Sequence, residues 1–219
     1  MAAAPSRCLL VTGPPVSPPK PSSFPPTTAS RPHAPGFWYP QGVGKTTLVM
    51  RVFETLKGSH PNLTIRGFYT REVRESGERV GFEVVTLDGR SGLLSSSKVS
   101  SPESVRWPTV GKYKVDVASL ESLALPELQV KEETDLFIID EVGKMELFSS
   151  AFFPAVMRVI EYNIPVLATI PIPRHGQDIP GVARLRNHPG AAVFTLNTGN
   201  RDMMRDTIYN QLNSLLQNR

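Results

Sequence analysis

Residues 42–48 read GVGKTTL, and residues 8–15 read CLLVTGPP. The first stretch ends like a phosphate-binding loop, whose pattern G-x-x-x-x-G-K-[ST] requires a further glycine upstream of Gly44. That glycine is missing from its place in the chain, but Gly13 in the second stretch supplies it once the two stretches are joined as LLVTGPPGVGKTTL. We therefore interpret the loop as interrupted and not as lost.

The surroundings of the loop support this interpretation. The apolar run Leu9–Thr12 predicts a strand before the loop, and the amphipathic pattern of residues 46–57 predicts a helix after it. A strand, a glycine-rich loop and a helix form the setting in which the backbone amides and the helix N-terminus hold phosphate groups. We expect phosphate to be bound by the backbone amides of the second half of the loop and by the ammonium group of Lys45. The amides are those of Gly42, Gly44, Lys45 and Thr46.

The segment between the two halves, Val16–Gln41, differs in composition from the rest of the chain. It holds 8 of the 21 prolines and no acidic residue. Proline lacks an amide donor and has a fixed φ, so we expect an extended or disordered insert. Valine codons begin with GT and glutamine can be encoded by CAG, so these 26 residues could be a retained intron of 78 nucleotides. A selected insertion with polyproline ligands such as PPKP remains the alternative.

A second motif lies in DLFIIDEVGKMEL, residues 135–147. The continuous apolar run before Asp140 predicts a buried parallel strand, which places Asp140 and Glu141 at the strand's carboxyl end, where ligands bind in open α/β sheets. We expect Asp140 to hold Mg²⁺ together with the Thr46 hydroxyl. Glu141 is then placed to activate a water molecule against a γ-phosphate. An acidic helix cap or solvated loop is the structural alternative for such a pair.

Other polar residues are weaker candidates. Lys144 and Glu146 follow the acidic pair and could reach the site, where Lys144 could contact the γ-phosphate or could simply be a surface lysine. Thr169 ends a predicted strand over residues 165–171, where it could contact the γ-phosphate or the water, or could simply be a satisfied strand-end hydroxyl. Asn200 and Arg201 open the last helix and could approach the base or the phosphates, with helix capping by Asn200 as the alternative. The four histidines lack metal-ligand spacing.

The remaining pattern predicts one α/β domain over residues 1–219. Residues 67–95 alternate apolar and polar side chains around two turns, which indicates antiparallel hairpins. Together with the buried strands this gives a mostly parallel, helix-flanked sheet with an antiparallel hairpin extension. In the last helix, an apolar stripe is expected to be core, formed by Met203, Met204, Ile208, Leu212 and Leu215.

Composition limits the partners. The net charge of +4 comes from dispersed residues, which argues against nucleic acid, and no apolar stretch approaches the length of a membrane span. The single cysteine is typical of a reducing compartment. We expect a monomer in the cytoplasm, with the nucleus as an open alternative.

Four stretches together resemble the cancer-related nucleoside-triphosphatase family: TGPP…GVGKTTL, GFYTREVRESGERVGFEVVTL, VGKYKVDVASLESLALPEL and IIDEVGKMELFS. The resemblance covers nearly all of the chain outside the insert. It implies a RecA-like P-loop fold and slow, Mg²⁺-dependent hydrolysis of ATP, GTP, CTP, UTP and TTP.

The resemblance also implies roles for individual residues. Phosphates would be bound by Gly13, Gly42, Gly44, Lys45 and Thr46, in a loop completed by Pro14, Pro15, Val43 and Thr47. The second nucleotide-binding segment would be Phe137, Ile138, Ile139, Asp140, Glu141, Val142, Gly143 and Lys144, with Glu141 as the base and Lys45 as the catalytic cation.

Two other functions are compatible with parts of the sequence. A nucleotide or small-molecule kinase uses the same loop, but Glu141 directly after Asp140 favours hydrolysis, and no arginine-rich lid is evident. An inactive splice isoform that acts only as a binding protein would follow from the interrupted loop.

Overall fold

The computed structural model describes residues 6–14, 44–173 and 177–217. The insert Val16–Gln41 and the loop residues Pro15, Gly42 and Val43 lie outside the described residues, so the calls made for them stay predictions. Among the described residues a nine-stranded sheet has the order β5-β6-β4-β3-β2-β7-β8-β1-β9.

Five neighbouring strands of this sheet are parallel: β9, β1, β8, β7 and the first part of β2. Their bounds are β1 Cys8–Thr12, β2 Ile65–Glu75, β7 Leu136–Asp140, β8 Val166–Thr169 and β9 Ala191–Thr195. All residues of β1, β7 and β8 are buried, as expected for parallel strands covered on both faces. Since β8 lies between β1 and β7, the strand that ends at Asp140 is one strand removed from the strand that leads to Gly13.

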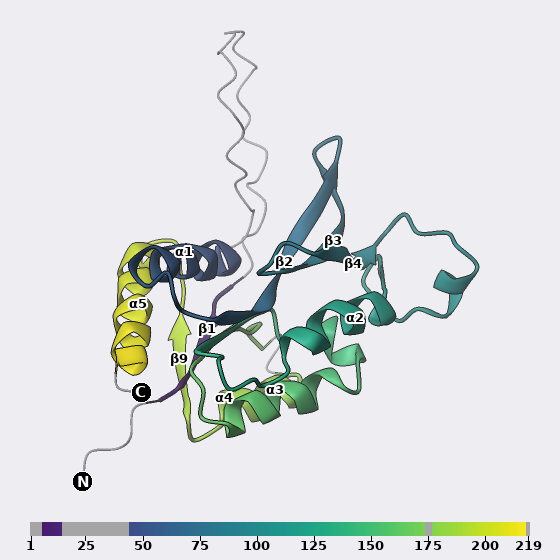
Figure 1. Ribbon diagram of the computed structural model, residues 1–219. Coiled ribbons are helices and arrows are strands. Elements are labelled where there is room, and N and C mark those ends of the chain that lie inside the picture. Colours follow the sequence, from purple (N-terminus) through teal and green to yellow (C-terminus); the bar gives the residue numbers. More distant parts are fainter. Residues whose placement is uncertain (1–5, 15–43, 174–176, 218–219) are drawn as a thin grey trace, which may run out of the picture.

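The antiparallel extension begins where β2 leaves the parallel part. β2 pairs with β7 from Ile65 to Tyr69, which lies opposite Asp140, and with β3 from Phe68 to Glu75, which lies opposite Glu78. Figure 1 shows the β2–β3 hairpin projecting from the body of the molecule. The other strands of the extension are β3 Glu78–Thr86, β4 Ser91–Ser96, β5 Thr109–Val110 and β6 Tyr113–Val115. The expected helix-flanked sheet with parallel strands and an antiparallel hairpin extension is confirmed; among the described residues it has four parallel and four antiparallel strand pairings.

Helices cover both faces of the parallel strands (Figure 1). One core joins Leu9 and Val11 of β1 to helices α1 and α5, and the other joins Cys8 and Leu10 to helices α2, α3 and α4. This alternation along β1 follows from the period of two in a strand. The helices are α1 Lys45–Ser59, α2 Val117–Glu127, α3 Phe152–Glu161, α4 Pro180–Arg186 and α5 Arg201–Gln217, with short 3₁₀ turns at Glu103–Arg106 (η1) and Glu146–Phe148 (η2).

One predicted core residue is exposed. Met204, Ile208, Leu212 and Leu215 pack toward the sheet, but the side chain of Met203 is 59% exposed. Positions four, eight and eleven residues after Met204 share its face of the helix, whereas Met203 is rotated by about 100° from that face. Among the helices of the described ranges, none is both long and apolar enough to cross a membrane.

Candidate active site

The phosphate-binding loop is described at its two ends. Gly13 follows β1 and is buried, and a Cβ atom there would lie 2.5 Å from the carbonyl oxygen of Leu196, in the loop after β9. Gly44 caps α1 with φ 82°, in the left-handed region that favours glycine. Both glycines are therefore required by backbone geometry, and both lie at the carboxyl edge of the parallel strands.

Lys45 and Glu141 meet at this edge. Lys45 is the first residue of α1, and Glu141 follows directly after β7. The Lys45 Nζ lies 2.9 Å from Glu141 Oε2, and the two side chains are 18% and 31% exposed. The structure thus brings together the lysine of the first motif and the predicted base of the second, although they are far apart in the sequence.

Asp140 lies beside this pair but is buried. Its Oδ1 accepts a hydrogen bond of 2.5 Å from the hydroxyl of Thr169, at the end of the neighbouring strand β8. Its Oδ2 is buried and accepts no hydrogen bond from the described residues. Burial raises the pKa of Asp140 to about 6, while the hydroxyl groups of Thr169 and Thr46 act to lower it. Thr169 therefore donates its hydroxyl hydrogen to Asp140 and is itself fully buried. This agrees with the alternative in which Thr169 is a satisfied strand-end hydroxyl.

A third carboxyl group, that of Glu146, is buried near the acidic pair. Glu146 is 4% exposed, and its Oε2 accepts a hydrogen bond of 3.0 Å from the amide of Gly143. Burial, followed by the charge of Glu141, raises the pKa of Glu146 to about 8. The sequence indicated only that Glu146 could reach the site. No pattern predicted its hydrogen bond to Gly143.

The remaining candidates differ in position. The guanidinium group of Arg201 lies against Gly44, since a Cβ atom on Gly44 would be 3.0 Å from the Arg201 Cζ. Asn200 accepts from the amide of Asn197 at 2.8 Å and donates to the carbonyl of Thr195 at 3.0 Å, so its side chain orders its own loop. Lys144 is exposed. The buried side chains of Phe137, Ile138, Ile139 and Val142 belong to the two hydrophobic cores.

Two features of the site have no signal in the sequence. The carbonyl of Leu196 approaches Gly13, and the buried hydroxyl of Thr12 makes no hydrogen bond within the described part of the chain. The first depends on the pairing of β1 with β9, which places Thr12 opposite Thr195 and so brings Leu196 to Gly13. A single sequence does not reveal which strands become neighbours.

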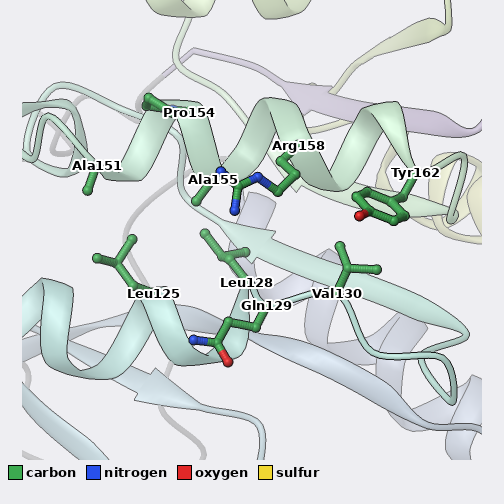
Figure 2. Close-up of a pocket in the computed structure, with 9 residues that line it drawn as sticks. All are labelled: Leu125, Leu128, Gln129, Val130, Ala151, Pro154, Ala155, Arg158 and Tyr162. Carbon is green, nitrogen blue, oxygen red and sulfur yellow. The ribbon is translucent and has the colours of Figure 1, made fainter.

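A hollow elsewhere on the surface contains none of these residues. Figure 2 shows it between the end of α2 and α3, with Arg158 projecting from α3 and Tyr162 directly after that helix. Its other lining residues are Leu125, Leu128, Gln129, Val130, Ala151, Pro154 and Ala155. The chemistry of the two motifs therefore lies at the carboxyl edge of the sheet and not in this groove.

Comparison with known proteins identifies similar chains. A family model described as NTPase matches residues 39–209. The human cancer-related nucleoside-triphosphatase is 42% identical over 169 residues, which cover 74% of this chain and 87% of that protein. The nucleoside-triphosphatase THEP1 of Thermotoga petrophila is 39% identical over 170 residues, which cover 77% of this chain and 87% of that protein. The solution structure of a human cancer-related nucleoside triphosphatase superposes with a TM-score of 0.70 at 36% identity, covering 95% of this chain and 98% of that one.

Proposed function

The chain belongs to the NTPase family and is a nucleoside-triphosphatase with a RecA-like P-loop fold, and from this premise we propose how its residues carry out the reaction. We propose Mg²⁺-dependent hydrolysis of nucleoside triphosphates with broad base specificity, taking ATP, GTP, CTP, UTP and TTP to the diphosphate and phosphate. Glu141 is the general base, Lys45 is the catalytic cation, and Thr46 and Asp140 hold the metal ion.

The observation that carries this proposal is the short distance between Lys45 and Glu141. The lysine of a phosphate-binding loop contacts the β- and γ-phosphates. A carboxylate whose Oε2 lies 2.9 Å from the Lys45 Nζ is therefore next to the place where a γ-phosphate would be held. Glu141 is also partly exposed, so water can reach it. This is the geometry expected of a base that activates a water molecule.

The residues around Asp140 fit a magnesium ion. Magnesium prefers oxygen ligands and is bound through one or two carboxylates together with substrate phosphates. Asp140 offers a buried oxygen that accepts no hydrogen bond within the described residues, and the Thr46 hydroxyl lies close enough to lower its pKa. No group of three or more His, Cys, Asp or Glu side chains in the described part of the chain could hold a metal by itself, which agrees with a site completed by phosphates.

In the proposed hydrolysis each group has a separate role. Bound Mg²⁺ would neutralise charge that develops on the β- and γ-phosphate oxygens. Glu141 orients a water molecule in line with the γ-phosphate and takes its proton as the new P–O bond forms. Lys45 exchanges the carboxylate of Glu141 for phosphate oxygens when the substrate binds, which frees Glu141 for the water. The bond between the γ-phosphorus and the bridging oxygen breaks, and the diphosphate leaves.

Other parts of the proposal follow from position. Arg201 approaches Gly44 at the start of α1, so its guanidinium group is a candidate contact to a phosphate or the base. The loop residues Gly13, Gly42 and Gly44 would supply the turn and amides around the phosphates.

We further propose that the chain acts as a monomer without nucleic acid.

We propose that the insert Val16–Gln41 weakens substrate binding. Closing a loop of this length costs roughly 3 kcal/mol; the part of this cost that is met only when phosphate orders the loop lowers the affinity for substrate, by up to about a hundredfold. Most phosphate-binding groups follow the insert in the chain, so the loss should be partial. Phe37, Trp38 and Tyr39 stand two residues before the second half of the loop and could add steric hindrance.

The test is phosphate release from ATP and GTP with and without Mg²⁺. It compares the full chain with a chain that lacks Val16–Gln41, each also carrying Glu141→Gln. We expect Mg²⁺-dependent turnover that is faster in the shortened chain and falls by about 10²-fold or more with Glu141→Gln in both. Turnover that persists with Glu141→Gln would remove Glu141 as the base. Transfer of phosphate to an added nucleoside monophosphate would instead indicate a kinase.

A further inference from the structure

The turn that carries Glu141 is anchored at several buried points. The amide of Val142 donates to the carbonyl of Thr169 at 2.8 Å, and the side chain of Val142 is fully buried. The carbonyl of Gly143 accepts from the amide of Leu147 at 3.1 Å. The amide of Gly143 donates to the Glu146 Oε2 at 3.0 Å. Among these anchors, only the last is made by a side chain.

Gly143 lies between two carboxyl groups. A Cβ atom at this position would be 2.6 Å from Glu141 Oε1 and 3.1 Å from Glu146 Oε2. The side chain of Glu141 therefore rests on the Cα of Gly143, and Glu146 approaches the same residue from the buried side. Any movement of Gly143 would change the surface against which the Glu141 carboxylate lies.

The surroundings of Glu146 suit a hydrogen-bond acceptor better than a charged group. Glu146 is 4% exposed, no cation is paired with it among the described residues, and burial raises its pKa to about 8. A neutral carboxyl group still accepts a hydrogen bond through its carbonyl oxygen. A glutamine side chain has nearly the same shape and offers the same acceptor.

We propose that Glu146 is a positioning residue for the general base: by accepting the amide of Gly143 it fixes the turn on which Glu141 rests and so aims Glu141 at the attacking water. This inference rests on the proposed role of Glu141. Misplacement of a reacting group by about 1 Å can cost about a hundredfold in rate, so loss of this bond should be measurable.

The first experiment measures kcat and KM of the full chain for ATP with Mg²⁺. Glu146→Ala should lower kcat by about tenfold or more and change KM by less than about threefold, because the phosphate-binding loop is untouched. Glu146→Gln should keep kcat within about threefold, because it retains the acceptor. Gly143→Ala should reproduce the defect of Glu146→Ala, since the new Cβ displaces the Glu141 carboxylate.

Two controls separate positioning from a general loss of structure. Glu121→Ala removes a different carboxylate, which accepts a hydrogen bond of 2.6 Å from the hydroxyl of Ser149 and so anchors the same segment at a point farther along the chain from Glu141. The kcat of this variant should match that of the unaltered chain. Glu146→Ala added to Glu141→Gln should cause no further loss, because the two residues act through one group. A full additional loss in the double variant, or equal losses with Glu146→Ala and Glu146→Gln, would overturn the proposal.

A measurement without turnover completes the test. The Gly143 amide should exchange slowly with solvent in the full chain and in Glu146→Gln, and at least about tenfold faster in Glu146→Ala. Equal protection in all three would show that Glu146 does not anchor the turn. If Glu141→Gln hydrolyses at the unaltered rate, the proposed base is wrong; if only the Glu146 predictions fail, the base assignment stands and the positioning role is rejected.

Discussion

Asp140 and Glu141 are adjacent in the chain, but the fold gives them different surroundings. Asp140 is buried, and one of its oxygens accepts a hydrogen bond from Thr169. The side chain of Glu141 is 31% exposed and forms an ion pair with Lys45. A buried carboxylate with one oxygen that accepts no hydrogen bond within the described residues suits a metal ion, and a partly exposed carboxylate beside a lysine suits a base that works on water. The division of roles is set by environment, because the two side chains differ by a single methylene group.

The buried carboxyl group of Glu146 should make stability depend on pH. Its pKa is raised from 4.5 to about 8 by burial, so the protonated form is favoured in the folded state. Its stabilising contribution is fully present below about pH 4.5 and is lost as the pH rises through about 8. Without nucleotide, the Tm of the unaltered chain should therefore fall relative to that of Glu146→Gln between these values. Parallel Tm curves for the two proteins would contradict this expectation.

At the scale of elements, the pairing of β2 with β7 connects the hairpin extension to the site. Gly67 of β2 lies opposite Ile138 of β7, two residues before Asp140. Gly67 has φ 129°, and a Cβ atom there would lie 1.8 Å from the carbonyl oxygen of Ile138. The two strands can approach in this register only because position 67 has no side chain.

Gly67→Ala should therefore be severely destabilising. The new methyl group meets a backbone atom of a central strand and cannot be accommodated by a side-chain rotation, so we expect a loss of at least about 3 kcal/mol in the free energy of unfolding. Gly58→Ala is the matched control, because it lies in α1 with nothing within 4 Å of its added Cβ. That change should be neutral or stabilising by up to about 1 kcal/mol. Denaturant unfolding of both variants checks the prediction, and a similar stability would refute it.

At the scale of the whole molecule, the first strand is an inner strand of the sheet, next to the edge strand β9, although it precedes the insert. β1 pairs with β8 on one side and β9 on the other, and its five residues are buried. Its side chains contribute to both hydrophobic cores. The short N-terminal part of the chain is thus bound to the body by two parallel ladders and by apolar packing, independently of the segment 15–43.

A chain split between Thr28 and Ala29 should consequently reassemble. When residues 1–28 and 29–219 are co-expressed, the two pieces should copurify in equal amounts and elute together on gel filtration. Leu9→Asp with Leu10→Asp in the small piece is the control, since both side chains are fully buried on opposite faces of the sheet. Recovery of a folded large piece without the small one would show that β1 is dispensable.

The sequence by itself determined the two described ends of the phosphate-binding loop, at Gly13 and Gly44, the buried parallel strands, the hairpin extension and the position of the acidic pair after a buried strand. These features are local: an apolar run, a period of two residues or a glycine at a fixed spacing is visible within about ten residues. The error at Met203 was also local, because one helical position separates the buried face from the exposed one.

Only the tertiary structure decided how the local features combine. The hydrogen bond from Thr169 to Asp140 depends on β8 lying beside β7, the fit of Leu196 against Gly13 depends on β9 lying beside β1, and the 2.9 Å contact of Lys45 with Glu141 depends on β8 lying between β7 and β1. The physical reason is that strand order is set by long-range burial of two helix layers against one sheet. That burial is a property of the whole chain and leaves no mark on any single stretch of it.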